Sequence, residues 1–143
     1  MNVAGILKTK GFNVITAAPS DTIAEISNIL GSNRIGAVLI VDASGALVGV
    51  VSERDIVRGL SECGEDCLQQ TASDLMTSSL ITTTASETID SVMGLMTDKR
   101  IRHLPVLDGD DLIGFISIGD IVKARMDEVE REAAALRDYI ATG

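Results

Sequence analysis

Aromatic side chains are scarce in this sequence. The 143 residues include two phenylalanines, one tyrosine and no tryptophan. Proteins that bind single-stranded nucleic acid stack its bases on exposed aromatic rings, so this chain lacks the side chains for that class of site. Apolar residues make up 45% of the chain and are mainly aliphatic, and 23% of the residues are charged. This is the composition of an ordinary folded domain, and we expect an aliphatic core.

Positive charge is also scarce. The chain has 12 lysines and arginines against 21 acidic residues, which gives a formal net charge of −9. A protein that binds duplex nucleic acid needs a basic face to replace the counterions around the phosphates. We therefore expect no nucleic-acid partner, although four basic or titratable residues gather within residues 99–103.

The chain has few cysteines and histidines and no long apolar run. These features argue against a zinc site, a membrane span and a signal peptide. The cysteines are Cys63 and Cys67, and the single histidine is His103. A structural zinc site needs about four such ligands, so we expect free thiols in a reducing compartment and no metal. No apolar run reaches the roughly 20 residues that span a membrane, and residues 1–10 lack the apolar core of a signal peptide. These features predict a cytoplasmic protein without a membrane partner.

The sequence contains one pattern twice. Residues of the first half recur 66 positions later, and the offset becomes 65 after a turn. A change of one residue within a turn is easily tolerated. The matches include Ile15-Thr16 with Ile81-Thr82, Arg34-Ile35 with Arg100-Ile101, and Asp55-Ile56-Val57 with Asp120-Ile121-Val122. We infer a duplicated structural unit.

Both copies predict the same order of elements, β-α-β-β-α, because apolar residues first alternate with a helical period and then form two short runs around a turn. The strands are expected at 14–16, 37–41 and 47–51 and again at 80–82, 104–107 and 112–116, with the closing helices starting at Ser52 and Ser117. This pattern predicts an α/β (α+β) fold with two repeats about a pseudo-twofold axis. The expected boundaries are an N-terminal helix at 1–13, repeats at 14–62 and 80–125, a linker at 63–79 and a helical extension at 126–143.

The last helix carries an apolar seam. Its members are spaced four and three residues apart, as in a coiled coil: Val122, Met126, Val129, Ala133, Leu136 and Ile140. Two interpretations stand. The seam packs against its own domain, or part of it contacts a second subunit.

Two pairs of segments resemble a known family. Residues 49–55 and 114–120 resemble the closing motif of cystathionine-β-synthase (CBS) domains, and residues 34–38 and 100–106 resemble the start of their second strand. Together they are similar to a tandem CBS pair, or Bateman module, of the small stand-alone bacterial type. The resemblance implies a regulatory module that binds AMP, ADP, ATP, NAD(H) or S-adenosylmethionine in clefts between the repeats, with AMP expected first, and that forms a homodimer. Similar modules accompany inosine-monophosphate dehydrogenase, but its catalytic barrel has no room in this length.

The closing motif, Gly-x-x-Ser-x-x-Asp, carries the expected ribose site. Ser52 and Ser117 lie where a strand gives way to a helix, and a helix start favours phosphate. The resemblance assigns the serines to ligand contact, and Asp55 and Asp120 to the ribose hydroxyls. A Ser-x-x-Asp pair also resembles a capping box, in which the acid reaches back to the start of the helix. Both interpretations remain open.

The residues before the second strand differ between the copies. The second copy has Arg102 and His103, where the family places phosphate contacts, and the first copy has Gly36 and Ala37. An arginine offers a planar fork for phosphate oxygens. We therefore expect the second site to bind phosphate better, and the first site to use Arg54 instead.

Three further residues complete the expected binding set. Arg100 belongs to the basic group of the second copy, whereas Lys99 fits the C-terminal end of a helix. Thr16 and Thr82 end the first strands, where their hydroxyls either reach the ligand or simply suit a strand. Backbone groups near Ala37 and His103 are expected to read the adenine.

No catalytic residues are predicted, because no nucleophile and base occur with an orienting third group. A nucleotide phosphatase is a minor alternative. The main alternative is a ligand-independent scaffold whose C-terminal helix docks a partner, and it predicts no thermal shift with any adenosine ligand. In the leading interpretation, the bound ligand biases an unidentified regulated protein.

Overall fold

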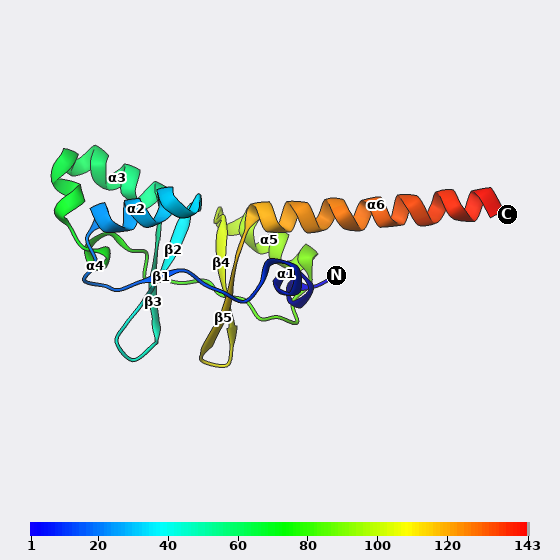
Figure 1. The fold of residues 1–143 in the computed structure, drawn as a ribbon, viewed down its shortest axis with the longest axis horizontal. Helices are drawn as coiled ribbons and strands as arrows, with labels where there is room; N and C mark the ends of the chain where they lie inside the picture. Colours follow the sequence, from blue (N-terminus) through cyan, green and yellow to red (C-terminus); the bar gives the residue numbers. More distant parts are fainter. Residues whose placement is uncertain (143) are drawn as a thin grey trace. The chain divides into compact units, whose positions relative to one another are not determined.

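The computed structural model describes residues 1–142, and Figure 1 shows the helices and strands in the predicted order, except that the strand expected at 80–82 is absent and α4 (Ala72–Leu75) is added between the repeats. The elements are α1 (Val3–Lys10), β1 (Thr16–Ala17), α2 (Ile23–Asn33), β2 (Ala37–Val41), β3 (Leu47–Ser52), α3 (Glu53–Cys63), the 3-10 helix η1 (Gly64–Gln69), α4 (Ala72–Leu75), α5 (Ile89–Lys99), β4 (His103–Asp108), β5 (Asp111–Ser117) and α6 (Ile118–Thr142). Both predicted hairpins, and the helices on either side of them, are confirmed.

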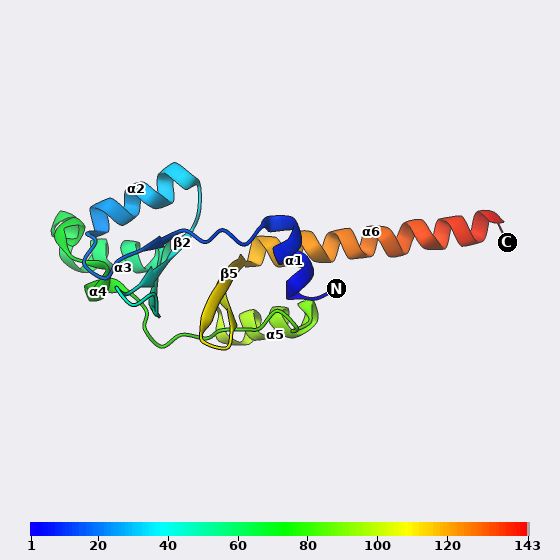
Figure 2. The ribbon, with the colours of Figure 1, turned by 60° about the horizontal axis from the view of Figure 1, so that its bottom comes forward.

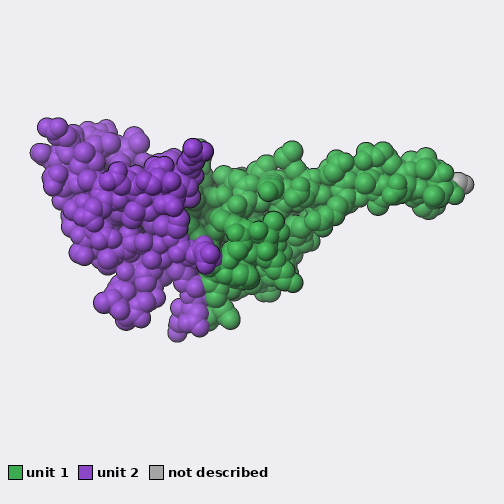
Figure 3. Space-filling view, in the orientation of Figure 1, with its two compact units in different colours: residues 1–12, 82–109, 113–143 green, residues 13–81, 110–112 purple. Residues whose placement is uncertain are grey.

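The chain folds as two compact units, which Figure 3 shows in different colours. Unit 1 comprises residues 1–12, 82–109 and 113–143, and unit 2 comprises residues 13–81 and 110–112. Unit 2 therefore contains the first repeat. Unit 1 contains most of the second repeat together with α1 and α6.

Unit 2 is built on a three-stranded sheet in the order β1-β2-β3. The central strand β2 is parallel to β1, with Thr16 opposite Leu39, and antiparallel to β3. Its sequence is apolar throughout and almost entirely buried, as expected for a strand covered on both faces. Helices α2 and α3 lie beside this sheet (Figure 2), and their apolar faces contribute Ile23, Ile26, Leu30 and Ile56 to the core.

In unit 1 the strand predicted at residues 80–82 does not form, and the sheet has two strands, β4 and β5. Thr83 makes a single bridge to β4, with hydrogen bonds from Thr83 N–H to Pro105 O (3.0 Å) and from Leu107 N–H to Thr83 O (2.9 Å). Pro105 stands where the first copy has Leu39, and a proline has no N–H to donate to a neighbouring strand. The missing donor explains why the strand pairing of unit 2 is reduced to one bridge here.

Each unit has a leading helix at the start of its repeat, α1 in unit 1 and α4 in unit 2. The helix at the N-terminal end was predicted, but α4 and its equivalence to α1 were not. In unit 1, Val3 N–H donates to Glu87 O (2.9 Å), and in unit 2, Ala72 N–H donates to Asp21 O (2.8 Å) at the corresponding place. The helices α1 and α4 are thus equivalent, with starts 69 residues apart. The helix α1 precedes the first repeat in the chain but packs in the unit of the second.

The segment at 63–79, expected to be a linker, instead forms η1 and α4 and contributes to the core of unit 2. Cys67 and Ala72 are fully buried there. A Cβ atom on Gly59 of α3 would lie 2.6 Å from Sγ of Cys67 and 2.6 Å from Cδ2 of Leu75. Only a residue without a side chain allows so close an approach.

The glycine of the closing motif also serves this packing. A Cβ atom on Gly49 would lie 2.5 Å from Sδ of Met76, and one on Gly114 would lie 2.6 Å from Cδ2 of Leu7. In each unit the leading segment thus lies directly against the motif strand. The shared glycine is explained by this contact without any ligand.

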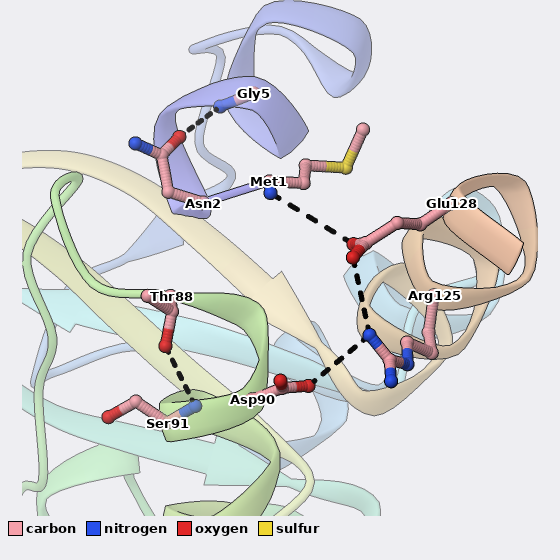
Figure 4. Close-up of polar contacts among 8 residues, drawn as sticks. All are labelled: Met1, Asn2, Gly5, Thr88, Asp90, Ser91, Arg125 and Glu128. Atoms are coloured by element: carbon pink, nitrogen blue, oxygen red, sulfur yellow. Dashed lines mark hydrogen bonds and ion pairs between the residues drawn. The ribbon is translucent and has the colours of Figure 1, made fainter. Parts of the chain in front are cut away.

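The 25-residue helix α6 packs on α1 and α5 near its start, where Ile121 and Ala124 are buried. Figure 4 shows the polar contacts at this base: Arg125 lies 3.5 Å from Asp90 and 3.3 Å from Glu128, and the terminal amino group lies 4.0 Å from Glu128. Within residues 1–142, neither α6 nor any shorter helix combines the length and the apolar character needed to cross a bilayer.

Candidate functional site

In unit 2 the closing motif forms a capping box at the start of α3. Ser52 Oγ accepts a hydrogen bond from Asp55 N–H (3.3 Å), and Asp55 Oδ2 accepts bonds from Ser52 N–H (2.8 Å) and Ser52 Oγ–H (3.0 Å). This reciprocal arrangement satisfies donors that a helix start leaves unpaired. The capping interpretation is therefore confirmed for this motif. A ligand would have to bind atoms of Ser52 and Asp55 that the cap leaves accessible.

The other carboxylate oxygen of Asp55 is also occupied. Oδ1 accepts hydrogen bonds from Arg58 Nη2 (2.8 Å) and Thr77 Oγ1 (3.3 Å), and the residue is 4% exposed. The Arg58 side chain, in contrast, is 59% exposed, and an ion pair at the surface contributes little to stability. A ligand hydroxyl would reach Asp55 by displacing this guanidinium.

In unit 1 the corresponding carboxylate is more exposed. Asp120 Oδ2 accepts hydrogen bonds from Ser117 N–H (2.8 Å) and Lys10 Nζ (2.7 Å), and Ser117 Oγ accepts one from Asp120 N–H (3.2 Å). Lys10 also donates to Phe115 O (2.7 Å). The Asp120 side chain is 25% exposed, against 6% for that of Asp55. This carboxylate is thus more accessible to a ligand than its counterpart in unit 2.

The surroundings hold Asp120 in its ionised form. Burial acts to raise the pKa of its carboxyl group, but the hydrogen bond from Lys10, the N–H of Ser117 and the positive charge of Lys10 together outweigh burial and lower the pKa. Because the pKa is lower in the folded protein than in the unfolded one, ionisation of Asp120 stabilises the fold above the unfolded pKa. This contribution is lost as the pH falls through the folded pKa.

Replacing Lys10 with glutamine is expected to raise the pKa of Asp120, because burial then acts without the opposing charge. A carboxyl-detected NMR titration of Asp120 in the wild type and the variant measures the change. Lys8→Gln, which removes an exposed lysine of the same helix, is the matched control and is expected to leave the titration unchanged. An unshifted Asp120 in Lys10→Gln would contradict the contact.

The residues before β2 and β4 lie next to the motif serines. Glu53 N–H donates to Gly36 O (2.9 Å), and Ile118 N–H donates to Arg102 O (2.8 Å), so each bond joins the first turn of a helix to the start of a strand. The structure therefore brings together Gly36, Ala37, Ser52 and Asp55 in unit 2, and Arg102, His103, Ser117 and Asp120 in unit 1.

These two clusters differ in charge. In unit 1, Arg102 is exposed and His103 is half-buried, with its ring centroid 5.6 Å from that of Phe115. In unit 2, the same positions hold the half-buried Gly36 and the buried Ala37. Unit 1 thus presents a guanidinium and an imidazole where unit 2 presents neither.

The structure places the other predicted residues as follows. Thr16 is exposed in β1, and Thr82 is exposed next to the bridge at Thr83. Arg54 is exposed in the first turn of α3. Arg34 and Arg100 end α2 and α5 in the left-handed conformation, each with φ of 54°. The arginine shared by the repeats therefore marks a helix C-cap.

Three residues that contact the motif carboxylates were not predicted from the sequence: Lys10, Arg58 and Thr77. The i,i+3 spacing of Asp55 and Arg58 on a helix was a usable signal. Lys10 and Thr77 lie in or just after the leading segments, which show no visible identity between the copies. No local pattern connects Lys10 with a carboxylate 110 residues away.

The cysteines are free, as predicted, with Cys63 exposed and Cys67 buried. Burial, and to a lesser extent Cys63 and Glu62, raises the pKa of the Cys67 thiol, which makes it a poor nucleophile. Among residues 1–142, no group of three or more His, Cys, Asp or Glu side chains is arranged to hold a metal ion.

Comparison with known proteins points to one family along the chain. The family model for the CBS domain matches residues 3–62 and 72–127, so both matches begin with the leading segments α1 and α4. A curated relative, the mitochondrial CBS domain-containing protein CBSX3 of Arabidopsis thaliana, is 32% identical over 99% of this chain and 72% of its own length.

Solved structures agree with this assignment. The CBS-domain containing protein ATU1752 from Agrobacterium tumefaciens is 40% identical, with a TM-score of 0.85 over 87% of this chain and 92% of that chain. The CBS domain pair of protein MJ0100, solved in complex with 5′-methylthioadenosine and S-adenosyl-L-methionine, is 29% identical, with a TM-score of 0.80 over 90% of this chain and 98% of that chain. The chain therefore belongs to the CBS-domain family, as a tandem CBS pair.

Proposed function

We propose that this CBS pair is a non-catalytic sensor that binds an adenosine ligand and biases a regulated partner protein. The observation that carries the proposal is the carboxylate of Asp120, which is held ionised at the start of α6 and whose side chain is 25% exposed, against 6% for Asp55. The two hydroxyls of a ribose are donors for such a carboxylate. The adenosine-type ligands of the MJ0100 pair support this class of ligand.

The surroundings of Asp120 favour a ligand that also carries phosphate. The start of α6 offers partial positive charge. Arg102 is exposed beside it, and Lys10 adds a second cation. We assign AMP to unit 1 as the first candidate, with ATP and NAD(H) next, and we assign no metal to the site.

Unit 2 is proposed as the weaker phosphate site. Gly36 and Ala37 supply no charge, so the cations near its motif are Arg54 and Arg58. Its Asp55 is already held by Arg58 and Thr77. Ribose binding there requires exchange of partners, which reduces the net gain in free energy.

Asp120→Asn is expected to weaken AMP binding by at least about tenfold, because hydrogen bonds to a charged group contribute roughly 1.5–3 kcal/mol and about 1.4 kcal/mol is tenfold. Calorimetric titration with AMP, ADP, ATP, NAD, NADH and S-adenosylmethionine measures the affinities. The matched control is Asp110→Asn in the exposed turn between β4 and β5, with affinity expected to be unchanged. Wild-type affinity for AMP in Asp120→Asn would overturn the assignment.

A ligand-independent scaffold is the second candidate function. It is favoured by the capping boxes, which explain Ser52 and Asp55 without any ligand. This alternative predicts no heat and no thermal shift with all six ligands. Turnover of AMP or ATP in the same samples would instead indicate an enzyme.

A further inference from the structure

The apolar seam of α6 is exposed in the described chain. Its large residues are Val122 (47% exposed), Met126 (67%), Val129 (51%), Leu136 (59%) and Ile140 (68%). Helix α6 contacts its own unit through a different set of side chains, which includes the buried Ile121 and Ala124 and the polar Arg125 and Glu128 of Figure 4. Of the two interpretations of the seam, packing against its own domain is therefore wrong.

An exposed seam of this length needs a partner. Isolated helices shorter than about 12–15 residues are marginal in water, and the distal part of α6 lies beyond the elements that support its base (Figure 1). The spacing of four and three averages about 3.5 residues, which is the period of two helices wound left-handedly around each other. This geometry calls for another helix with the same period.

We propose that the partner is α6 of a second copy of this chain, aligned parallel and in register over residues 122–140. A second copy supplies an identical seam, so that each apolar residue meets its own counterpart or the next one along. The proposal does not depend on ligand binding.

The charges that flank the seam favour the parallel arrangement. With Met126, Ala133 and Ile140 at the first apolar position of each heptad, Arg125 and Glu132 lie on one flank, and Glu130 and Arg137 lie on the other. In a parallel pair, each residue of the first flank faces the residue five positions later in the second helix. Glu132 then meets Arg137 of the second copy, and Arg125, which also contacts Asp90 and Glu128 of its own unit, lies opposite Glu130 of the second copy.

The same charges disfavour an antiparallel pair that overlaps over the whole of residues 122–140. There, residues of one flank face the same flank of the second helix, so Glu130 would face Glu130 of the second copy and Lys123 would face Arg137. Like charges in such positions repel. Within one helix Glu130 and Arg137 are both exposed and lie only 3.3 Å apart, a weak contact that is readily exchanged for one between helices.

Sedimentation equilibrium of the full chain tests the interface. Leu136→Lys places a charge in the seam and is expected to raise the dimer dissociation constant by about a hundredfold or more, because two leucines lose their burial. The matched control is Ala135→Lys, which adds the same charge at the exposed neighbouring position and is expected to dimerise like the wild type. Helix content from circular dichroism at high concentration confirms that both variants fold. A monomeric wild type, or a Leu136→Lys dimer of wild-type affinity, would overturn the proposal.

Disulfide trapping tests the orientation. In a Cys63→Ser background, which leaves the buried Cys67 as the other thiol, Ile140→Cys is expected to cross-link two chains under mild oxidation. In an antiparallel pair, residue 140 faces the opposite end of the seam and no cross-link forms. Ala141→Cys, on the outer side of the parallel pair, is the control that is expected to remain reduced. Cross-linking of Ala141→Cys but not of Ile140→Cys would refute the parallel alignment.

Discussion

Replacing Asp55 with alanine is expected to lower the free energy of unfolding by about 2–3 kcal/mol, against about 1 kcal/mol for Asp120→Ala. Asp55 is 4% exposed and receives hydrogen bonds from Ser52, Arg58 and Thr77. Its removal leaves the Ser52 N–H and the Thr77 hydroxyl without this acceptor, although Ser52 Oγ still caps α3. Asp120 is more exposed, and its partner Lys10 returns to water when the carboxylate is removed.

Urea denaturation of the two alanine variants beside the wild type measures this difference. Thr77→Val is expected to reproduce a smaller part of the Asp55 effect, because it removes one of the donors and keeps the shape. Equal losses of unfolding free energy for Asp55→Ala and Asp120→Ala would contradict this prediction. They would show that the deeper burial of Asp55 does not make it more stabilising than Asp120. The expected difference in stability also affects ligand assays. Weaker binding by an Asp55 variant can come from a less stable fold as well as from the loss of a contact with the ligand.

The same substitution at two helical glycines is expected to change stability in opposite directions. Gly59→Ala places a methyl group 2.6 Å from both Cys67 and Leu75. Overpacking of this kind costs about 1–3 kcal/mol. At Gly31, in α2 of the same unit, an added Cβ would have no neighbouring atom within 4 Å. Gly31→Ala is therefore expected to stabilise unit 2 by about 0.5–1 kcal/mol through helix propensity.

Thermal and urea unfolding of the two glycine variants provide the measurement, with each serving as the control of the other. Cys67→Ala combined with Gly59→Ala is expected to recover part of the loss, because it removes one of the two contacts. Stabilisation by Gly59→Ala alone would mean that η1 and α4 do not pack against α3 as described.

The repeated pattern was enough to predict the hairpins, the helices around them and the position of both motif carboxylates. These features depend on local periodicity, and local periodicity is visible in residues such as Ile23, Ile26 and Leu30. The seam of α6 was visible for the same reason. Its partner was not, because the spacing of apolar residues is the same for a contact within a domain and a contact between chains.

Three features could not be predicted, each for a physical reason. The strand at 80–82 is lost because Pro105 lacks one N–H group. The repeat pattern compares apolar spacing and takes no account of a single backbone donor. The equivalence of α1 and α4 rests on shared position and hydrogen bonds without evident sequence identity, so the predicted N-terminal helix gave no sign of α4. Lys10 reaches Asp120 through tertiary packing alone.

The place of α1 has a consequence for synthesis of the chain. Nearly all of unit 2 is one continuous stretch, residues 13–81, whereas unit 1 joins the first twelve residues to residues beyond 81. Domains made early on the ribosome fold as they emerge, so unit 2 has all but its last few residues available while α1 still lacks the surface on which it packs. Residues 1–12 are thus made before unit 2 but pack after it. A substitution in these residues would act on the second repeat rather than on the first.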